Sequence, residues 1–97
     1  MRLSEREKTA IVEAIREEDP TAEVYLFGSR VDDTRRGGDI DLYIETALDK
    51  NLLKHQARIL SRLWDRIGAQ HIDIILKPRQ SPMHAIHQVA KDTGVQL

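Results

Sequence analysis

Two aspartates of the sequence lie in a stretch that otherwise reads as a buried β-strand. Asp39 and Asp41 alternate there with three aliphatic residues, Ile40, Leu42 and Ile44. Side chains two apart on a strand point to the same face, so the two carboxylates share one face and the aliphatic side chains take the other. At ~5 Å and an effective dielectric of about 20, the two charges repel by roughly 3 kcal/mol. A divalent cation reverses the sign of this interaction, and the pair therefore predicts a metal site.

A third aspartate repeats the pattern further along the chain. Asp73 lies between Ile72 and Ile74, again with the acid on one face and aliphatic residues on the other. If the two strands are sheet neighbours, Asp73 stands beside the pair. Magnesium takes oxygen ligands and leaves its other positions to water and substrate phosphates. Three carboxylates on one face suit two Mg²⁺ ions roughly 3.5–4 Å apart, the spacing used for in-line displacement at phosphorus. We therefore predict Asp39, Asp41 and Asp73 as metal-binding and catalytic residues.

A glycine-serine turn precedes the first acidic pair. Gly28 has no Cβ, so a phosphate can approach its backbone closely. Ser29 offers a hydroxyl and a backbone N–H at the start of the following turn, where anions are favoured. Arg30 is within reach of a phosphate, although a solvated arginine is an equally simple interpretation. The sequence predicts Gly28, Ser29 and Arg30 as nucleotide-binding residues, with an ordinary turn as the alternative.

The spacing of apolar residues predicts six elements that position these side chains, in the order α-β-β-α-β-α. The expected helices cover 5–18, 49–67 and 82–94, and the expected strands cover 23–27, 39–45 and 70–76. The last helix is expected to begin with Ser81 as N-cap and Pro82 at its first position. Trp64 falls in the apolar stripe of the second helix and is expected in the core. The prediction is an α/β (α+β) fold, a small mixed β-sheet with helices packed on one side.

Composition limits the class of protein. The chain has 97 residues, 40% hydrophobic and 32% charged, which fits one globular domain. The absence of cysteine excludes thiol catalysis, disulfides and cysteine-type zinc sites. A net charge of −1 argues against an extended nucleic-acid surface. No apolar run approaches the roughly 18 residues that would cross a membrane, and no signal-peptide pattern is present, so a soluble cytoplasmic protein is expected.

The motif GSR at residues 28–30 followed by GDIDL at 38–42 resembles the signature of the polymerase-β-type nucleotidyltransferase superfamily. The short chain resembles the minimal nucleotidyltransferases of that group. The resemblance implies the nucleotidyltransferase fold in a single domain over 1–97. It also implies that Gly28 and Ser29 hold a nucleoside triphosphate, that the acidic pair binds the metals, and that Asp73 helps to activate the attacking hydroxyl.

Minimal members are similar to the antitoxins of toxin–antitoxin pairs whose partner is a HEPN-type ribonuclease. The resemblance thus implies a magnesium-dependent enzyme that transfers AMP from ATP to a hydroxyl of that partner protein. Because little follows the third strand, the partner is expected to complete the acceptor side of the site. The alternative is a non-catalytic antitoxin that neutralises a partner by direct contact. Three retained acids favour the enzyme over this alternative, and over an ordinary α/β domain with incidental acids.

Overall fold

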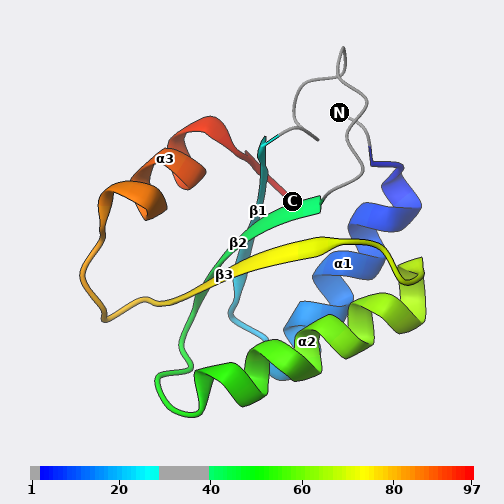
Figure 1. Ribbon diagram of the computed structural model, residues 1–97, viewed down its shortest axis with the longest axis horizontal. Coiled ribbons are helices and arrows are strands. Elements are labelled where there is room, and N and C mark those ends of the chain that lie inside the picture. Colours follow the sequence, from blue (N-terminus) through cyan, green and yellow to red (C-terminus); the bar gives the residue numbers. More distant parts are fainter. Residues whose placement is uncertain (1–2, 29–39) are drawn as a thin grey trace.

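The computed structural model describes residues 3–28 and 40–97 (Figure 1). The predicted order α-β-β-α-β-α is confirmed, and a two-residue strand that the sequence did not indicate follows the last helix. The elements are α1 (Glu5–Glu18), β1 (Glu23–Phe27), β2 (Ile40–Thr46), α2 (Leu52–Ile67), β3 (Ile72–Pro78), α3 (Ala85–Thr93) and β4 (Val95–Gln96). None of the helices in the described ranges is long and apolar enough to cross a membrane.

The strands form one mixed sheet in the order β3-β2-β1-β4. Strand β2 runs antiparallel to β1 and parallel to β3, and β4 is antiparallel to β1. Parallel neighbours need a crossover connection, and α2 provides it between β2 and β3. Strand β2 is therefore central, and the residue at its second position, Asp41, lies between Phe27 of β1 and Asp73 of β3.

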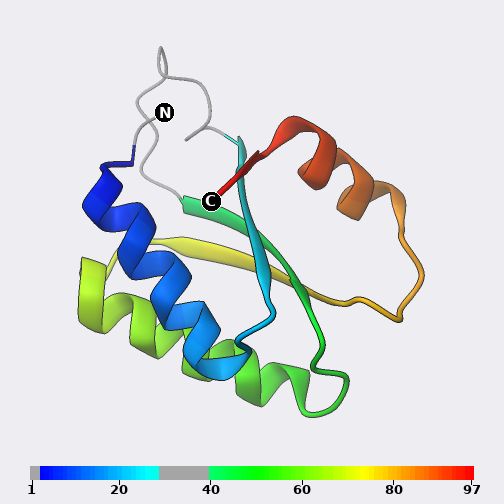
Figure 2. The ribbon, with the colours of Figure 1, turned by 180° about the vertical axis from the view of Figure 1, so that it is seen from behind.

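The main core lies on one face of the sheet, beneath α1 and α2. Figure 2 shows these two helices side by side along that face. Ion pairs join them, with Arg62 Nη2 placed 3.1 Å from Glu18 Oε1. The strands contribute alternate aliphatic side chains to this core and the helices contribute their inward-facing ones. The fully buried members include Leu26, Ile40, Leu42 and Ile44 from the strands, and Ile11, Ile15, Ile59 and Leu63 from the helices.

The third helix lies on the opposite face of the sheet. The expectation that the helices pack on one side holds for α1 and α2 but is wrong for α3, which packs on Tyr25 and Tyr43 through Ala90. Topology explains the difference. Strand β3 lies at one edge and β4 at the other, so the connecting chain must cross a face of the sheet. The first face is already covered, and the two tyrosines give α3 an apolar surface on the second.

The start of α3 differs from the prediction. The helix begins at Ala85 rather than Pro82. The Ser81 hydroxyl donates a hydrogen bond back to the Pro78 carbonyl at 2.8 Å, and the Ser81 N–H donates to the same oxygen at 3.1 Å. These bonds close a turn at residues 78–81. The serine therefore stabilises a turn instead of capping a helix.

The orientation of α2 also corrects one expectation. Trp64 is 44% exposed, whereas the neighbouring Leu63 and Ile59 are buried. The Trp64 indole N–H donates to the Gln70 carbonyl at 2.9 Å, which gives its polar atom a partner near the surface. Adjacent positions on a helix differ by about 100°, and both Leu63 and Trp64 border the apolar stripe of α2. The sequence pattern therefore did not decide which of the two side chains is buried.

Candidate active site

Three of the six predicted site residues belong to the described part of the chain: Gly28, Asp41 and Asp73. The other three, Ser29, Arg30 and Asp39, lie outside the described residues. The described part of the site therefore comprises β2, β3 and the turn residue Gly28.

The structure brings Asp41 and Asp73 together. They are register partners on the parallel strands β2 and β3, and register partners on adjacent parallel strands project to the same face at a strand spacing of ~4.8 Å. Asp41 is partly buried, and the Asp73 side chain is 58% exposed. Water near Asp73 screens the repulsion between the two carboxylates. The two acids thus lie side by side, with Asp73 open to solvent, as a metal ion bound by both would require.

The turn glycine lies directly against Asp41. Gly28 follows Phe27, the register partner of Asp41, and has a left-handed φ of +77°. A Cβ added to Gly28 would overlap Oδ2 of Asp41 and lie 3.1 Å from its Cγ. Only a residue without a side chain fits both this backbone conformation and this contact. The predicted phosphate turn and the predicted metal ligand are therefore in contact.

A histidine that the sequence analysis did not single out accompanies Asp73. The Nε2 atom of His71 lies 3.4 Å from Asp73 Oδ1, and its side chain is 66% exposed. The His71 carbonyl accepts a hydrogen bond of 3.0 Å from the N–H of Ile40, which fixes the backbone at this end of the sheet. The signal for His71 was its place two residues before Asp73, since this spacing predicts a common face.

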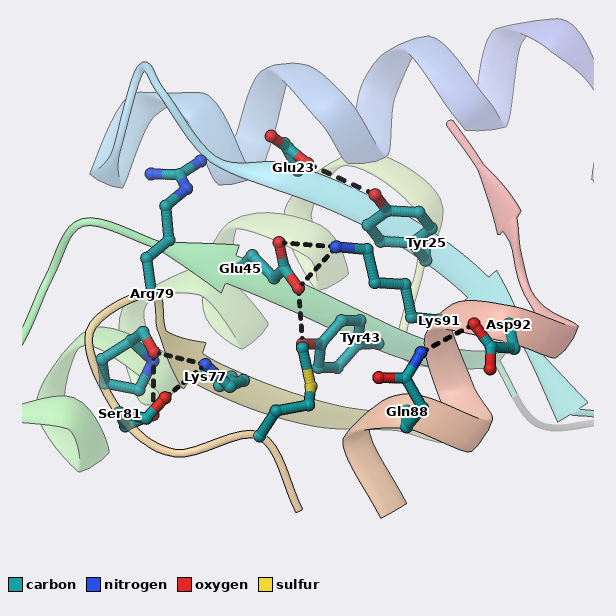
Figure 3. A network of polar contacts seen from close by, with 12 residues as sticks. Glu23, Tyr25, Tyr43, Glu45, Lys77, Arg79, Ser81, Gln88, Lys91 and Asp92 are labelled. Atoms are coloured by element: carbon teal, nitrogen blue, oxygen red, sulfur yellow. Dashed lines mark hydrogen bonds and ion pairs between the residues drawn. The ribbon is translucent and has the colours of Figure 1, made fainter. Parts of the chain in front are cut away.

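A second polar group occupies the same face further along β2. The buried carboxylate of Glu45 accepts a hydrogen bond of 2.8 Å from the Tyr43 hydroxyl and pairs with Lys91 at 3.2 Å (Figure 3). Burial and the bond to Glu45 raise the pKa of Tyr43. Burial opposes ionisation of Glu45, but the bonds from Tyr43 and Lys91 lower its pKa. Glu45 therefore holds α3 to the sheet.

The basic residues at the end of β3 form hydrogen bonds within the protein. Lys77 is 4% exposed, and its ammonium donates to the carbonyls of Pro78 at 2.9 Å and Ser81 at 2.8 Å (Figure 3). Arg79 donates to the Thr21 hydroxyl at 3.1 Å. Both lie at the opposite end of β3 from Asp73. The contacts of Lys77 stabilise the turn after β3, and Arg79 joins that turn to the segment before β1.

The donor set suits a hard divalent cation. Asp41 and Asp73 supply carboxylate oxygens, and Mg²⁺ is usually held by one or two carboxylates together with water and phosphate oxygens. Within residues 3–28 and 40–97 no group of three or more His, Cys, Asp or Glu side chains is placed to hold a metal. The described pair thus fits magnesium, with Asp39 as the predicted further ligand from outside the described residues.

Comparison with known families agrees with this geometry. The family model described as "Nucleotidyltransferase domain" matches residues 8–93, a range that includes Gly28, Asp41 and Asp73. A search of curated proteins found no match. The family match supports the superfamily resemblance and nucleotidyl transfer from a nucleoside triphosphate as the general activity. The α+β arrangement of helices and mixed sheet is consistent with the fold of this family. The chain belongs to the nucleotidyltransferase domain family.

Proposed function

We propose that this protein is a magnesium-dependent nucleotidyltransferase that transfers AMP from ATP to a hydroxyl group of a partner protein. The observation that carries the proposal is the contact set around Asp41, which has Asp73 as its register partner and Gly28 against its carboxylate. A candidate metal-ligand pair and the predicted phosphate-binding turn thus lie at one place. The family match supports the coarser activity, nucleotidyl transfer.

Asp41 and Asp73 would hold magnesium together with Asp39. When bound, the metal stabilises negative charge on the attacking and leaving oxygens of the phosphoryl group. Gly28, whose missing Cβ leaves the space that Oδ2 of Asp41 fills, would offer its backbone to the triphosphate, and Ser29 and Arg30 are the proposed further phosphate contacts. The acceptor hydroxyl attacks the α-phosphorus, an oxygen–phosphorus bond forms, and the bond to the β-phosphate breaks to release pyrophosphate. The Asp73 carboxylate accepts the proton of the hydroxyl.

A macromolecular acceptor is supported by the exposure of the site. The Asp73 side chain is 58% exposed, and α3 packs over β1 and β2 on this face. An acceptor carried by another protein can therefore approach the β3 side of the face from solvent. The acceptor that the family resemblance implies is a HEPN-type ribonuclease modified on a tyrosine or a similar residue, which makes this chain the antitoxin of the pair. The proposed unit is a single minimal domain over 1–97.

One observation favours the second candidate, a non-catalytic antitoxin. Ile86 and Val89 are neighbours on the outer face of α3 and are 56% and 57% exposed, and Met83 precedes them at 42%. Exposed apolar residues on one helix face are typical of protein contact surfaces. In this alternative the partner is neutralised by contact alone, so neutralisation would survive loss of the acids.

The experiment that separates the two functions uses ATP labelled at the α-phosphate, Mg²⁺ and the protein encoded beside this chain. The wild type should add AMP to the partner, visible as a mass shift, and Asp41→Asn should abolish the shift while melting like the wild type or slightly higher. Neutralisation of the partner should fail in the same variant. If Asp41→Asn neutralises the partner fully without a mass shift, the contact function is correct and the enzymatic one is not.

A further inference from the structure

We infer that His71 is a positioning residue that holds the Asp73 carboxylate in the orientation needed for metal binding. The inference rests on the proposed function, since it concerns a residue that orients one of the proposed metal ligands. It concerns a residue outside the signature motifs, because His71 lies before β3 and far from the Gly-Ser turn in the sequence.

The contact engages one oxygen of the carboxylate. His71 Nε2 lies 3.4 Å from Asp73 Oδ1, so a small adjustment brings the two atoms within ordinary hydrogen-bonding distance. A carboxylate has two oxygens, so a hydrogen bond from His71 to Oδ1 would leave Oδ2 available to a metal ion. Ligating carboxylates are commonly oriented by such outer hydrogen bonds.

The backbone fixes the histidine relative to both acidic strands. The His71 carbonyl accepts the Ile40 N–H at 3.0 Å, and Ile40 is the register partner of Ile72. The imidazole therefore starts from the end of β3 at which Asp73 faces Asp41. Two lysines of the described face have other contacts, since Lys77 donates to backbone carbonyls and Lys91 pairs with Glu45.

The exposure of the pair argues for orientation over stability. The side chains of His71 and Asp73 are 66% and 58% exposed, and exposed pairs contribute little to the free energy of folding. Magnesium, in contrast, demands near-ideal octahedral geometry. A change in carboxylate orientation therefore affects metal affinity while the fold stays intact, and the two effects are separable by measurement.

The test compares His71→Leu, which removes the donor, with His71→Gln, whose amide N–H reaches about as far as Nε2. His84→Leu is the matched control, because His84 is also exposed but its ring lies beside that of His87, with 5.6 Å between the ring centres. Each protein is titrated with Mn²⁺ in the presence of α,β-methylene ATP, with free Mn²⁺ followed by electron paramagnetic resonance. The Tm without metal is measured in parallel.

We expect His71→Leu to weaken Mn²⁺ affinity by roughly 10–100-fold, with an unchanged Tm in the absence of metal. His71→Gln should remain within a few-fold of the wild type, and His84→Leu should match it. If the wild type binds Mn²⁺ and His71→Leu binds it equally well, the positioning role is wrong and the proposed function stands. A wild type that binds no Mn²⁺ and transfers no AMP overturns both.

Discussion

At the scale of single residues, the site depends on a fit between Gly28 and Asp41. The glycine has a φ of +77°, and its missing side chain leaves the space in which Oδ2 of Asp41 lies. Two requirements therefore meet at one residue, a left-handed backbone and a close carboxylate. Gly68 has only the first of them, since its φ is +91° and no atom lies within 4 Å of an added Cβ.

This contrast allows a prediction for Gly28→Ala with Gly68→Ala as the control. A left-handed conformation costs an L-residue roughly 1–2 kcal/mol, which lowers the Tm of a domain of this size by roughly 5–10 °C. We expect both variants to melt lower for this reason. Only Gly28→Ala should also displace Asp41 and weaken Mn²⁺ and nucleotide binding, as measured by calorimetric titration. Equal binding in the two variants would show that Gly28 is needed only for its backbone conformation and not for its contact with Asp41.

The candidate site was partly predictable at this scale. The alternation of acids and aliphatic residues placed each aspartate on the polar face of its own strand, because strand geometry has a period of two. That Asp41 and Asp73 lie side by side also required β2 and β3 to be neighbours in the sheet, which the structure shows. The same rule applied to His71, but an isolated histidine is common on surfaces and only the contact with Asp73 distinguishes it. The contact of Gly28 with Asp41 depends on the register between β1 and β2, which local sequence does not specify.

At the scale of elements, a buried carboxylate joins the end of α1 to the end of β2. Asp19 accepts hydrogen bonds from the Thr46 hydroxyl at 2.6 Å and the Ala47 N–H at 2.8 Å, and from the Thr21 N–H and hydroxyl at 2.9 and 2.7 Å. Burial opposes ionisation, but these bonds outweigh it and lower the pKa of Asp19 from 3.8 to about 2. The residue therefore stabilises the fold in its charged form.

The lowered pKa gives a prediction with a definite sign. A carboxyl group whose pKa is lower in the folded state contributes its full stability above the unfolded pKa, near 4, and loses it as the pH falls through about 2. The shift corresponds to about 2 kcal/mol. Asp19→Asn should therefore be less stable than the wild type at pH 6, and the difference should shrink between pH 4 and pH 2. The difference in stability is measured from the midpoints of urea unfolding at each pH.

The exposed Asp65→Asn on α2 is the control for this comparison. Its midpoint should follow that of the wild type at every pH, because an exposed charge away from a hydrogen-bond network changes stability little. A gap between Asp19→Asn and the wild type that stays constant down to pH 2 would contradict the assigned role of the ionised carboxylate.

The attachment of α3 depends on a different carboxylate, Glu45. Lys91 lies 3.2 Å from it and carries its ammonium 5.8 Å from the centre of the Tyr25 ring. Lys91→Met keeps the aliphatic stem but removes one of the two side-chain donors that Glu45 has among the described residues, leaving the Tyr43 hydroxyl. We expect a loss of about 1–2 kcal/mol and faster amide hydrogen exchange in α3. Gln88→Met, which breaks only an exposed bond to Asp92, should change neither.

At the scale of the whole molecule, the sequence predicts the order of elements well and their arrangement less well. Periodicity identified the helices and longer strands because each one carries its own apolar pattern. It did not identify β4, whose two residues, Val95 and Gln96, form a strand only by pairing with β1. That same pairing requires the chain that carries α3 to cross the sheet from β3 to the far edge. Long-range contacts of this kind produce no recognisable pattern in the local sequence.

The charge of the whole molecule leads to a prediction about the acceptor. The net charge is −1, and on the described face that carries Asp41 and Asp73 two lysines, Lys77 and Lys91, are bound to protein oxygens. Tight binding of a polynucleotide needs several cations to neutralise phosphates. With labelled ATP, Mg²⁺ and a lysate, the label should therefore appear on protein. It should resist ribonuclease and be released by protease. A label that ribonuclease removes and protease leaves would show that the acceptor is an RNA end and that the proposed protein acceptor is wrong.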